Sequence, residues 1–343
     1  MGLKIYKGYS LLGHNTFRID VKGEYFVEFA SLQDLNEIHK LISGGKLPRR
    51  TLLIGGGSNL LFTKDFEGTV LHSVIDSFEI ISQCEDSVKV KVGSGWKWDD
   101  FVAKTVENGW WGAENLSYIP GDVGSCAVQN IGAYGAEFKD IVEEVEAFDL
   151  ESGEIRRFSL QECCYGYRES IFKSLQYASM VITAVTFVLQ KNGKPNFSYS
   201  HLRSEFNDNP NPSLAQIREK VIEVRRSKLP DVSEIGSAGS FFKNPIVPKE
   251  HYKQLLEIYP SIPAFDVEGN EFCMKLSAGW LIEQCGWKGK SLDGKAGVYH
   301  KQALVLVNLS NATGEQVLSL ARSVASSVRE KFSVELVPEV IIL

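Results

Sequence analysis

Two glycine-rich segments have the composition of loops that hold a phosphorylated ligand. Residues 119–135 read IPGDVGSCAVQNIGAYG, with four glycines around a Gln-Asn pair and a tyrosine. Residues 52–59 read LLIGGGSN, so these glycines directly follow a short apolar run that is typical of a buried strand. Because glycine lacks a Cβ, its backbone N–H groups can approach a pyrophosphate closely. Two such segments predict a large phosphorylated cofactor; the alternative interpretation is that they are merely tight, mobile loops.

A serine, an arginine and a glutamate are further candidates for chemistry. Ser240 lies in GSAGSFFKNP, where small residues leave its hydroxyl beside two aromatic rings, a lysine and an amide. This segment lacks the G-x-S-x-G turn and the histidine partner of a nucleophilic serine, which favours a proton donor or a ligand group. Arg168 lies in YGYRES, and Glu339 lies in the apolar stretch VPEVIIL. Each residue also has a structural interpretation. For Ser240 it is a structural turn, for Arg168 a surface ion pair, and for Glu339 a charge that protects a strand edge. A lone acid in a buried strand is costly, which favours a function for Glu339.

Three other kinds of site are not expected from the sequence. Residues 286–291 end like a phosphate-binding P-loop, but Gln284 stands where that motif needs its first glycine. Residues 93–95 begin a dinucleotide-binding fingerprint, but Trp98 occupies its third glycine position. The six histidines lie far apart in the sequence, so no metal site is expected.

The composition predicts a folded protein whose partners are small molecules. With 343 residues, the chain is long enough for two or three domains. A net charge of -6, with dispersed lysines and arginines, argues against a nucleic-acid surface. No apolar stretch reaches the roughly 18 to 20 residues of a membrane span, and no secretory signal is visible. Six cysteines without a CxxC pattern suit reduced thiols, so we expect a cytoplasmic protein without membrane contact.

Capping residues followed by apolar residues at helical spacing predict three helices. The first begins after Ser31, with Asp34 placed like the acidic member of a capping box. The second begins at Asp99 and ends at Gly109, where glycine can adopt a left-handed conformation. The third spans about 314–332, after a capping box formed by Thr313 and Gln316.

Strand signals alternate with these helices, which predicts a mixed α and β fold. Residues 87–92 alternate apolar and polar side chains, as in a half-buried strand, and the apolar run 180–189 predicts a buried one. The Pro- and Asn-rich stretch 207–212 precedes a further helix that carries Ile217, Val221 and Val224. We expect the main domain boundary just after that helix, near 228–230.

Five motifs in a fixed order give the chain a specific resemblance. They are GGGSN at 55–59, IPG with QNIGAYG across 119–135, YRESIFK at 167–173, GSFFKNP at 239–245 and PEV at 338–340. Over nearly its whole length the chain resembles the type I form of the bacterial UDP-N-acetylenolpyruvoylglucosamine reductase family, which acts in peptidoglycan synthesis. The resemblance implies an α+β fold with a two-part FAD-binding region of the vanillyl-alcohol-oxidase (PCMH) type, followed by an α+β substrate-binding domain. The implied domains are 1–72, to which 335–343 returns at the flavin, then 73–228 and 229–334.

The resemblance also implies a reaction. NADPH reduces a non-covalent FAD, and the flavin N5 hydride adds to the methylene carbon of the enolpyruvyl ether in UDP-N-acetylglucosamine enolpyruvate. Ser240 then delivers a proton to carbon, giving UDP-N-acetylmuramate. Arg168 stabilises the negative charge that develops on the carboxylate, and Glu339, kept protonated by apolar surroundings, donates a hydrogen bond.

The binding residues are likewise carried over from the resemblance. Those expected to bind the cofactor are Gly55, Gly56, Gly57, Ser58, Asn59, Ile119, Pro120, Gly121, Gly124, Ser125, Gln129, Asn130, Ile131, Gly132, Ala133, Tyr134 and Gly135. Those expected to bind the substrate are Tyr167, Tyr199, Lys228, Asn244 and Gln302. The family often carries proline where Ala127 stands and no cysteine at Cys126, which predicts a less stiff flavin loop. A monomer is expected.

Two alternatives remain open at this point. A different flavin oxidase would share the FAD-binding half and consume oxygen with an alcohol substrate, but the GSFFKNP and PEV segments count against it. A flavin- or nucleotide-binding sensor would need the glycine loops and would stay fully active with Glu339 replaced by Gln.

Overall fold

The computed structural model describes residues 3–197, 200–207, 209–267 and 269–343. The chain forms two compact units: Met1–Tyr9, Lys22–Gly56 and Phe66–Arg225 make up the first, and Ser10–Val21, Gly57–Asp65 and Arg226–Leu343 make up the second. Both contain helices and sheets, as the predicted α+β fold class requires. The finer division after residues 72, 228 and 334 stays a prediction. None of the helices in the described ranges is long and apolar enough to cross a membrane.

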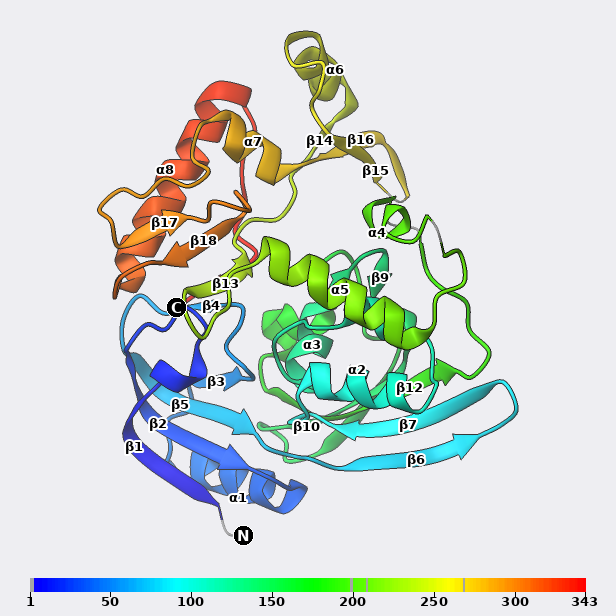
Figure 1. The fold of residues 1–343 in the computed structure, drawn as a ribbon. Helices are drawn as coiled ribbons and strands as arrows, with labels where there is room; N and C mark the ends of the chain where they lie inside the picture. Colours follow the sequence, from blue (N-terminus) through cyan, green and yellow to red (C-terminus); the bar gives the residue numbers. More distant parts are fainter. Residues whose placement is uncertain (1–2, 198–199, 208, 268) are drawn as a thin grey trace. The chain divides into compact units, whose positions relative to one another are not determined.

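The first unit contains a four-stranded sheet with one helix against it (Figure 1). Its strand order is β1 (Lys4–Ser10), β2 (Lys22–Phe29), β5 (Phe66–Ser73) and β3 (Thr51–Ile54). Helix α1 (Leu32–Ser43) buries Leu35 and Ile38 in a core shared with β2 and β5. The predicted cap at Ser31 is confirmed, because its hydroxyl accepts a hydrogen bond from the Asp34 N–H at 3.2 Å. The glycines that follow β3 are thus held at the end of a parallel strand, which is half-buried except at Ile54 rather than buried as expected.

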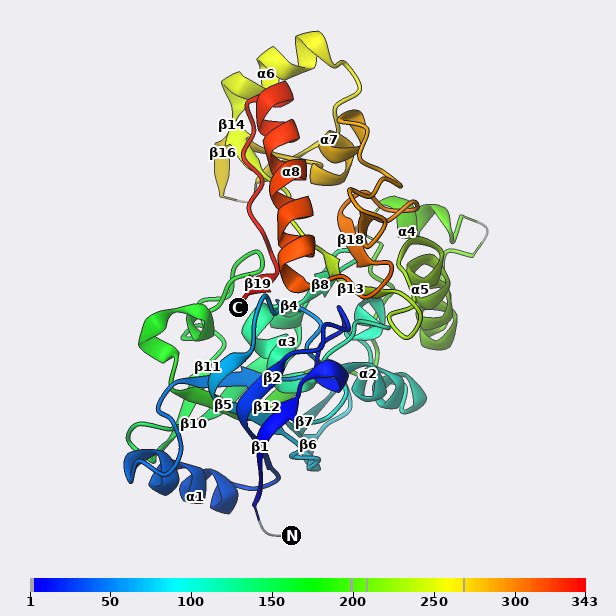
Figure 2. The same cartoon turned by 90° about the vertical axis from the view of Figure 1, so that its left-hand side faces the viewer.

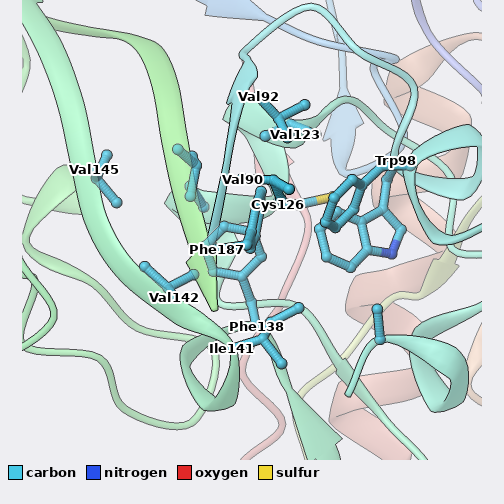
Figure 3. Close-up of a cluster of buried hydrophobic side chains, with 14 of the residues drawn as sticks. Val90, Val92, Trp98, Val123, Cys126, Phe138, Ile141, Val142, Val145 and Phe187 are labelled. Carbon is cyan, nitrogen blue, oxygen red and sulfur yellow. The ribbon is translucent and has the colours of Figure 1, made fainter. Parts of the chain in front are cut away.

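A five-stranded antiparallel sheet forms the rest of this unit's framework. Its order is β11 (Ile155–Ser159), β10 (Val142–Asp149), β12 (Met180–Gln190), β7 (Ser87–Gly93) and β6 (Phe78–Gln83). The two predicted strands are confirmed, since β7 alternates in burial and β12 is buried along most of its length. Helices α2 (Trp98–Glu107) and α3 (Val123–Gln129) pack against this sheet and share its core. In this core the ring centroids of Trp98 and Phe187 lie 6.0 Å apart (Figure 3). The first unit also contains two short strands, β8 (Gly132–Ala133) and β9 (Ala136–Glu137), and helix α4 (Ser200–Ser204). Helix α5 (Leu214–Lys228) begins in the first unit, and its last three residues belong to the second.

The second predicted helix is confirmed as α2, and Gly109 follows its end with a φ of 72°. It begins one residue before Asp99, whose carboxylate binds the Arg218 guanidinium at 2.7 and 2.9 Å and does not cap the helix. One sequence prediction about this region was wrong. Residues 119–135 are not one loop, because α3 occupies their centre. Val123, Cys126 and Ala127 are spaced i, i+3 and i+4, so they share one helix face and are buried in the core. Cys126 and Ala127 therefore lie in a helix, and their expected effect on the stiffness of this segment stays a prediction.

The second unit is built on two three-stranded antiparallel sheets. They consist of β13 (Gly236–Ser240), β18 (Val305–Asn308) and β17 (Ala296–Val298), and of β14 (Ile246–Pro248), β16 (Asn270–Leu276) and β15 (Ala264–Val267). Their helices are α6 (Lys249–Ile258), α7 (Ala278–Gln284) and α8 (Gly314–Phe332), and α8 runs beside β17 and β18 (Figure 2). The predicted capping box of Thr313 and Gln316 starts α8 as expected. The chain end returns as β19 (Ile341–Ile342), which pairs in parallel with β4 (Leu60–Leu61).

Candidate active site

The two glycine-rich segments meet in the first unit. A Cβ on Gly55 would lie 2.8 Å from the Ser125 Oγ, and a Cβ on Gly56 would lie 3.2 Å from the Gly121 Cα. Only glycine lets the two backbones approach this closely. In the part of the chain that the structure describes, the N–H groups of Gly55 and Gly56 donate no hydrogen bond to the protein. These groups therefore fit the phosphates of a dinucleotide.

The residues after α3 offer a second kind of contact for a flavin. The Gln129 Oε1 is buried and has no hydrogen-bond partner among the described residues, so it fits an N–H donor on a ligand. Asn130 ends α3 in a left-handed conformation, and its side chain donates to the carbonyl of Gly166 at 2.8 Å and to Glu137 at 2.9 Å. The segment is thereby tied to the loop that carries Arg168. An orphaned acceptor and a close glycine cradle together fit FAD.

Arg168 lies against this same segment. Its guanidinium donates to the carbonyls of Gly132 at 2.7 Å and Asn130 at 3.4 Å. The ring of Tyr167 lies 5.6 Å from the guanidinium carbon. Arg168 itself has a φ of 57°, a conformation that non-glycine residues adopt rarely and that is often found at functional sites.

A second arginine belongs to this region and was missed from the sequence. Arg225, on α5, donates from Nε to the Tyr118 carbonyl at 3.0 Å. Burial lowers its pKa; Tyr134 and Asp99 oppose this shift, and the neighbouring charge of Arg168 adds to it. Two guanidinium groups thus lie close to residues 130–134. No local signal distinguishes Arg225 from the other basic residues of its helix.

Ser240 and Glu339 are brought together within the second unit. The C-terminal stretch runs along the segment after β13: the Glu339 N–H donates to the Phe241 carbonyl at 2.8 Å, and the Lys243 N–H donates to the Val337 carbonyl at 2.9 Å. Ser240 is exposed at the end of β13, next to Gly239 with a φ of 70°. This register puts the backbone of Glu339 next to the segment that carries Ser240.

The surroundings of Glu339 differ from the expected buried strand. It lies in a bend before β19 and is half-buried, and the two isoleucines of β19 are exposed. The strand at the chain end is short, because Ile341 and Ile342 are its two residues that pair with β4. Glu339 therefore lies before this strand and not within a buried one. Asn59, which was predicted to bind the cofactor, donates to the Glu339 carbonyl at 3.2 Å and holds the bend.

Two of the predicted substrate residues converge on the start of α7. The Asn244 Oδ1 accepts a hydrogen bond from the Ala278 N–H at 3.0 Å. The Gln302 Oε1 accepts from the Leu304 N–H at 3.3 Å and would lie 3.1 Å from a Cβ on Gly279. Lys228 is the last residue of α5 and, like Asn244 and Gln302, belongs to the second unit. Tyr199 lies outside the described residues.

Comparison with known proteins identifies the relatives of this chain. Residues 231–343 match the model of the UDP-N-acetylenolpyruvoylglucosamine reductase C-terminal domain, and residues 23–159 match that of an FAD-binding domain. Proteins named UDP-N-acetylenolpyruvoylglucosamine reductase are 47% identical in Bacteroides fragilis, over 97% of this chain and 98% of the relative, and 41% identical in Chromobacterium violaceum, over the full length of both.

A solved structure supports the fold. The crystal structure of UDP-N-acetylenolpyruvylglucosamine reductase from Thermus caldophilus aligns with 100% of this chain and 99% of its own, with a TM-score of 0.68 and 22% identity. Both the FAD-binding part and the family's own C-terminal domain are therefore present in one chain. The chain belongs to the UDP-N-acetylenolpyruvoylglucosamine reductase family of FAD-dependent oxidoreductases, as its ordered motifs predicted.

Proposed function

We propose that this protein reduces UDP-N-acetylglucosamine enolpyruvate to UDP-N-acetylmuramate with electrons from NADPH, as a cytoplasmic step of peptidoglycan synthesis. The observation that carries this proposal is the full-length identity of 47% to a relative named for this reduction. The chemistry supplied by bound FAD is transfer of a hydride from NADPH to the methylene carbon of the enolpyruvyl ether.

The cofactor is held, in this proposal, by the two glycine segments. The N–H groups of Gly55 and Gly56 bind the diphosphate, and the Gln129 Oε1 accepts from an N–H of the flavin ring system. The contacts between Gly55, Gly56 and the 121–125 segment support this assignment. We assign the remaining predicted cofactor residues of 55–59 and 119–135 to the same site.

Arg168 supplies positive charge to the substrate carboxylate. After the hydride adds to the methylene carbon, negative charge spreads from the adjacent carbon into this carboxylate. A planar guanidinium offers two parallel N–H donors to carboxylate oxygens, and their benefit grows as the charge develops. The carbonyls of Gly132 and Asn130 orient the Arg168 side chain, which supports this role. Arg225 adds to the positive potential of the region.

Ser240 delivers the proton that completes the reduction, and Glu339 assists it. The hydroxyl O–H bond breaks as a C–H bond forms at the carbon that carries the carboxylate, and the product gains one hydride and one proton. The backbone hydrogen bond between Glu339 and Phe241 keeps both side chains on adjacent segments, which supports their joint action. A serine hydroxyl is a weak acid, so a nearby cation is needed, for which we propose Lys228.

The UDP-sugar contacts the second unit through Asn244, Gln302 and Lys228, with Tyr199 and Tyr167 contributing phenol groups. The convergence of Asn244 and Gln302 on the start of α7 supports a shared binding surface. Their carbonyl oxygens are used by the protein, so their amide N–H₂ groups are the donors offered to the ligand.

The test is NADPH consumption in the presence of the enolpyruvyl nucleotide. We expect stoichiometric NADPH oxidation and a product heavier than the substrate by two hydrogens, with UDP-N-acetylglucosamine as the inactive control nucleotide. Oxygen uptake with an alcohol and no response to the enolpyruvyl nucleotide would favour a flavin oxidase. Flavin binding without NADPH oxidation in the presence of the nucleotide would favour a binding protein, and full activity of Glu339→Gln would exclude a chemical role for Glu339.

A further inference from the structure

Asp122 is a buried acid at the junction of the two glycine segments, and none of the assigned roles includes it. It is the N-cap residue of α3, and its side chain is 3% exposed. The Oδ1 atom accepts a hydrogen bond from the Lys97 ammonium at 2.7 Å, and the Lys97 side chain is 59% exposed. The backbones of Lys97 and Asp122 also form an antiparallel bridge, so the two residues are held side by side.

The second carboxylate oxygen faces the glycine loop. The Oδ2 atom has no hydrogen-bond partner among the residues that the structure describes. It lies 3.1 Å from the position of a Cβ on Gly55 and 3.9 Å from the Nε2 of His72. His72 belongs to β5, the strand that pairs with β3, and its Nδ1 lies 3.5 Å from a Glu28 oxygen. One carboxylate therefore contacts the residue before α2, the glycine loop after β3 and the neighbouring strand.

Helix capping does not explain a charged group here. Asparagine and serine cap helices as well as aspartate does. A buried carboxylate costs free energy unless it is paired, and a negative charge beside a loop that receives phosphates adds repulsion. The hydrogen bond from Lys97 offsets that cost, and the approach of Oδ2 to Gly55 is what places the carboxylate between α3 and the glycine loop.

We propose that Asp122 is a positioning residue for the FAD diphosphate. Its carboxylate, held by Lys97, packs beside Gly55 and fixes the Gly55–Gly56 segment against α3, so that the N–H groups of both glycines are aimed at the phosphates. Asp122 itself touches no phosphate. The inference rests on the proposed FAD site and deepens it.

The test compares two flavins on the full-length protein after its flavin has been removed. FAD binding is followed by quenching of flavin fluorescence, and riboflavin serves as a probe that has the ring but no phosphates. Asp122→Asn keeps the cap and the size but removes the charge. We expect its Kd for FAD to rise about 10- to 100-fold, the effect of losing a charged hydrogen bond. Its Kd for riboflavin should stay near the wild-type value.

A second substitution keeps the inference testable if Asp122→Asn folds poorly. Lys97→Met should raise the Kd for FAD about 3-fold or more. Lys97→Arg keeps the positive charge and should have the wild-type Kd for FAD. The double variant should bind FAD no more weakly than Asp122→Asn alone, because both changes remove one interaction. The matched control is Glu143→Gln, which breaks the exposed ion pair with Lys89 on the same unit and should leave both Kd values unchanged.

The outcomes separate this inference from the proposed function. Unchanged FAD binding by Asp122→Asn and Lys97→Met, or an equal loss for FAD and riboflavin, would reduce Asp122 to an ordinary structural residue. Additive effects in the double variant would also contradict the pairing. A wild-type protein that binds no FAD would overturn the proposed cofactor site first, and the positioning role with it.

Discussion

Replacing Gly55 with alanine tests whether the contact between the two glycine segments is as tight as the structure indicates. The new Cβ would lie 2.8 Å from the Ser125 Oγ, 2.9 Å from the Ser125 Cβ and 3.1 Å from the Asp122 Oδ2. The Ser125 Cβ cannot rotate away because it is bonded to the backbone of α3, so the helix or the loop must shift. Overpacking of this kind costs about 1–3 kcal/mol. At about 2–4 °C per kcal/mol for a unit of this size, the melting temperature should fall by about 2–12 °C.

Calorimetry of the protein without flavin measures this loss, and fluorescence titration measures FAD affinity, which should also weaken because the loop is displaced. Gly13→Ala is the control, because a Cβ there meets nothing within 4 Å. Ser125→Gly removes the two closest atoms, so adding Gly55→Ala to Ser125→Gly should cost much less stability than adding it to the wild type. If Gly55→Ala melts and binds FAD like Gly13→Ala, the described contact between the segments is wrong.

Four further predictions follow from individual side chains. Burial opposes the ionisation of Glu146, but its hydrogen bonds with Lys91 and Arg157 hold its pKa below the usual range. The ionised Glu146 therefore stabilises the folded protein above the unfolded pKa of about 4.3, and this contribution is lost as the pH falls through the lower folded pKa. Urea unfolding between pH 6 and 3 should show Glu146→Gln losing less stability than wild type on acidification, and parallel curves would refute this. Phe187→Ala should cost about 3–5 kcal/mol in the same assay, because the ring is fully buried and stacks 4.5 Å from Phe101; a loss below 1 kcal/mol would contradict the packing. Burial raises the pKa of the Cys163 thiol to about 12 and raises that of the Cys126 thiol well above its usual range. A thiol reagent at pH 8 should therefore label the exposed Cys84 and Cys164, and it should label Cys126 and Cys163 only after unfolding. Ser240→Ala should slow substrate reduction about 100- to 10,000-fold while flavin reduction by NADPH stays at the wild-type rate; equal loss in both half-reactions would exclude a specific role as proton donor.

Local signals in the sequence predicted much of the framework. The caps at Ser31 and Thr313 and the alternation over 87–92 involve residues within one turn or one strand, so their physical cause is visible in the sequence itself. The family resemblance predicted the rest of the fold, because five motifs spread over the chain appear in a fixed order.

Interactions between residues far apart in sequence could not be predicted in this way. Asp99 looks like a helix cap until Arg218, 119 positions later, takes its carboxylate. The glycines of 119–135 suggested one loop, but burial of Val123, Cys126 and Ala127 outweighs the low helix propensity of Gly124. Arg225 and Asp122 acquire their surroundings only when α5 packs near Tyr118 and when α3 meets the glycine loop.

The central claim is that electrons pass from NADPH through bound flavin to the enolpyruvyl nucleotide. The most direct measurement follows the visible flavin absorbance of the purified protein without oxygen, first with NADPH and then with UDP-N-acetylglucosamine enolpyruvate. We predict bleaching by NADPH and recovery of the oxidised spectrum on addition of the nucleotide, with one nucleotide reduced per flavin. A flavin that NADPH bleaches but the enolpyruvyl nucleotide does not reoxidise would contradict the proposed substrate, and a protein that binds no flavin would contradict the account as a whole.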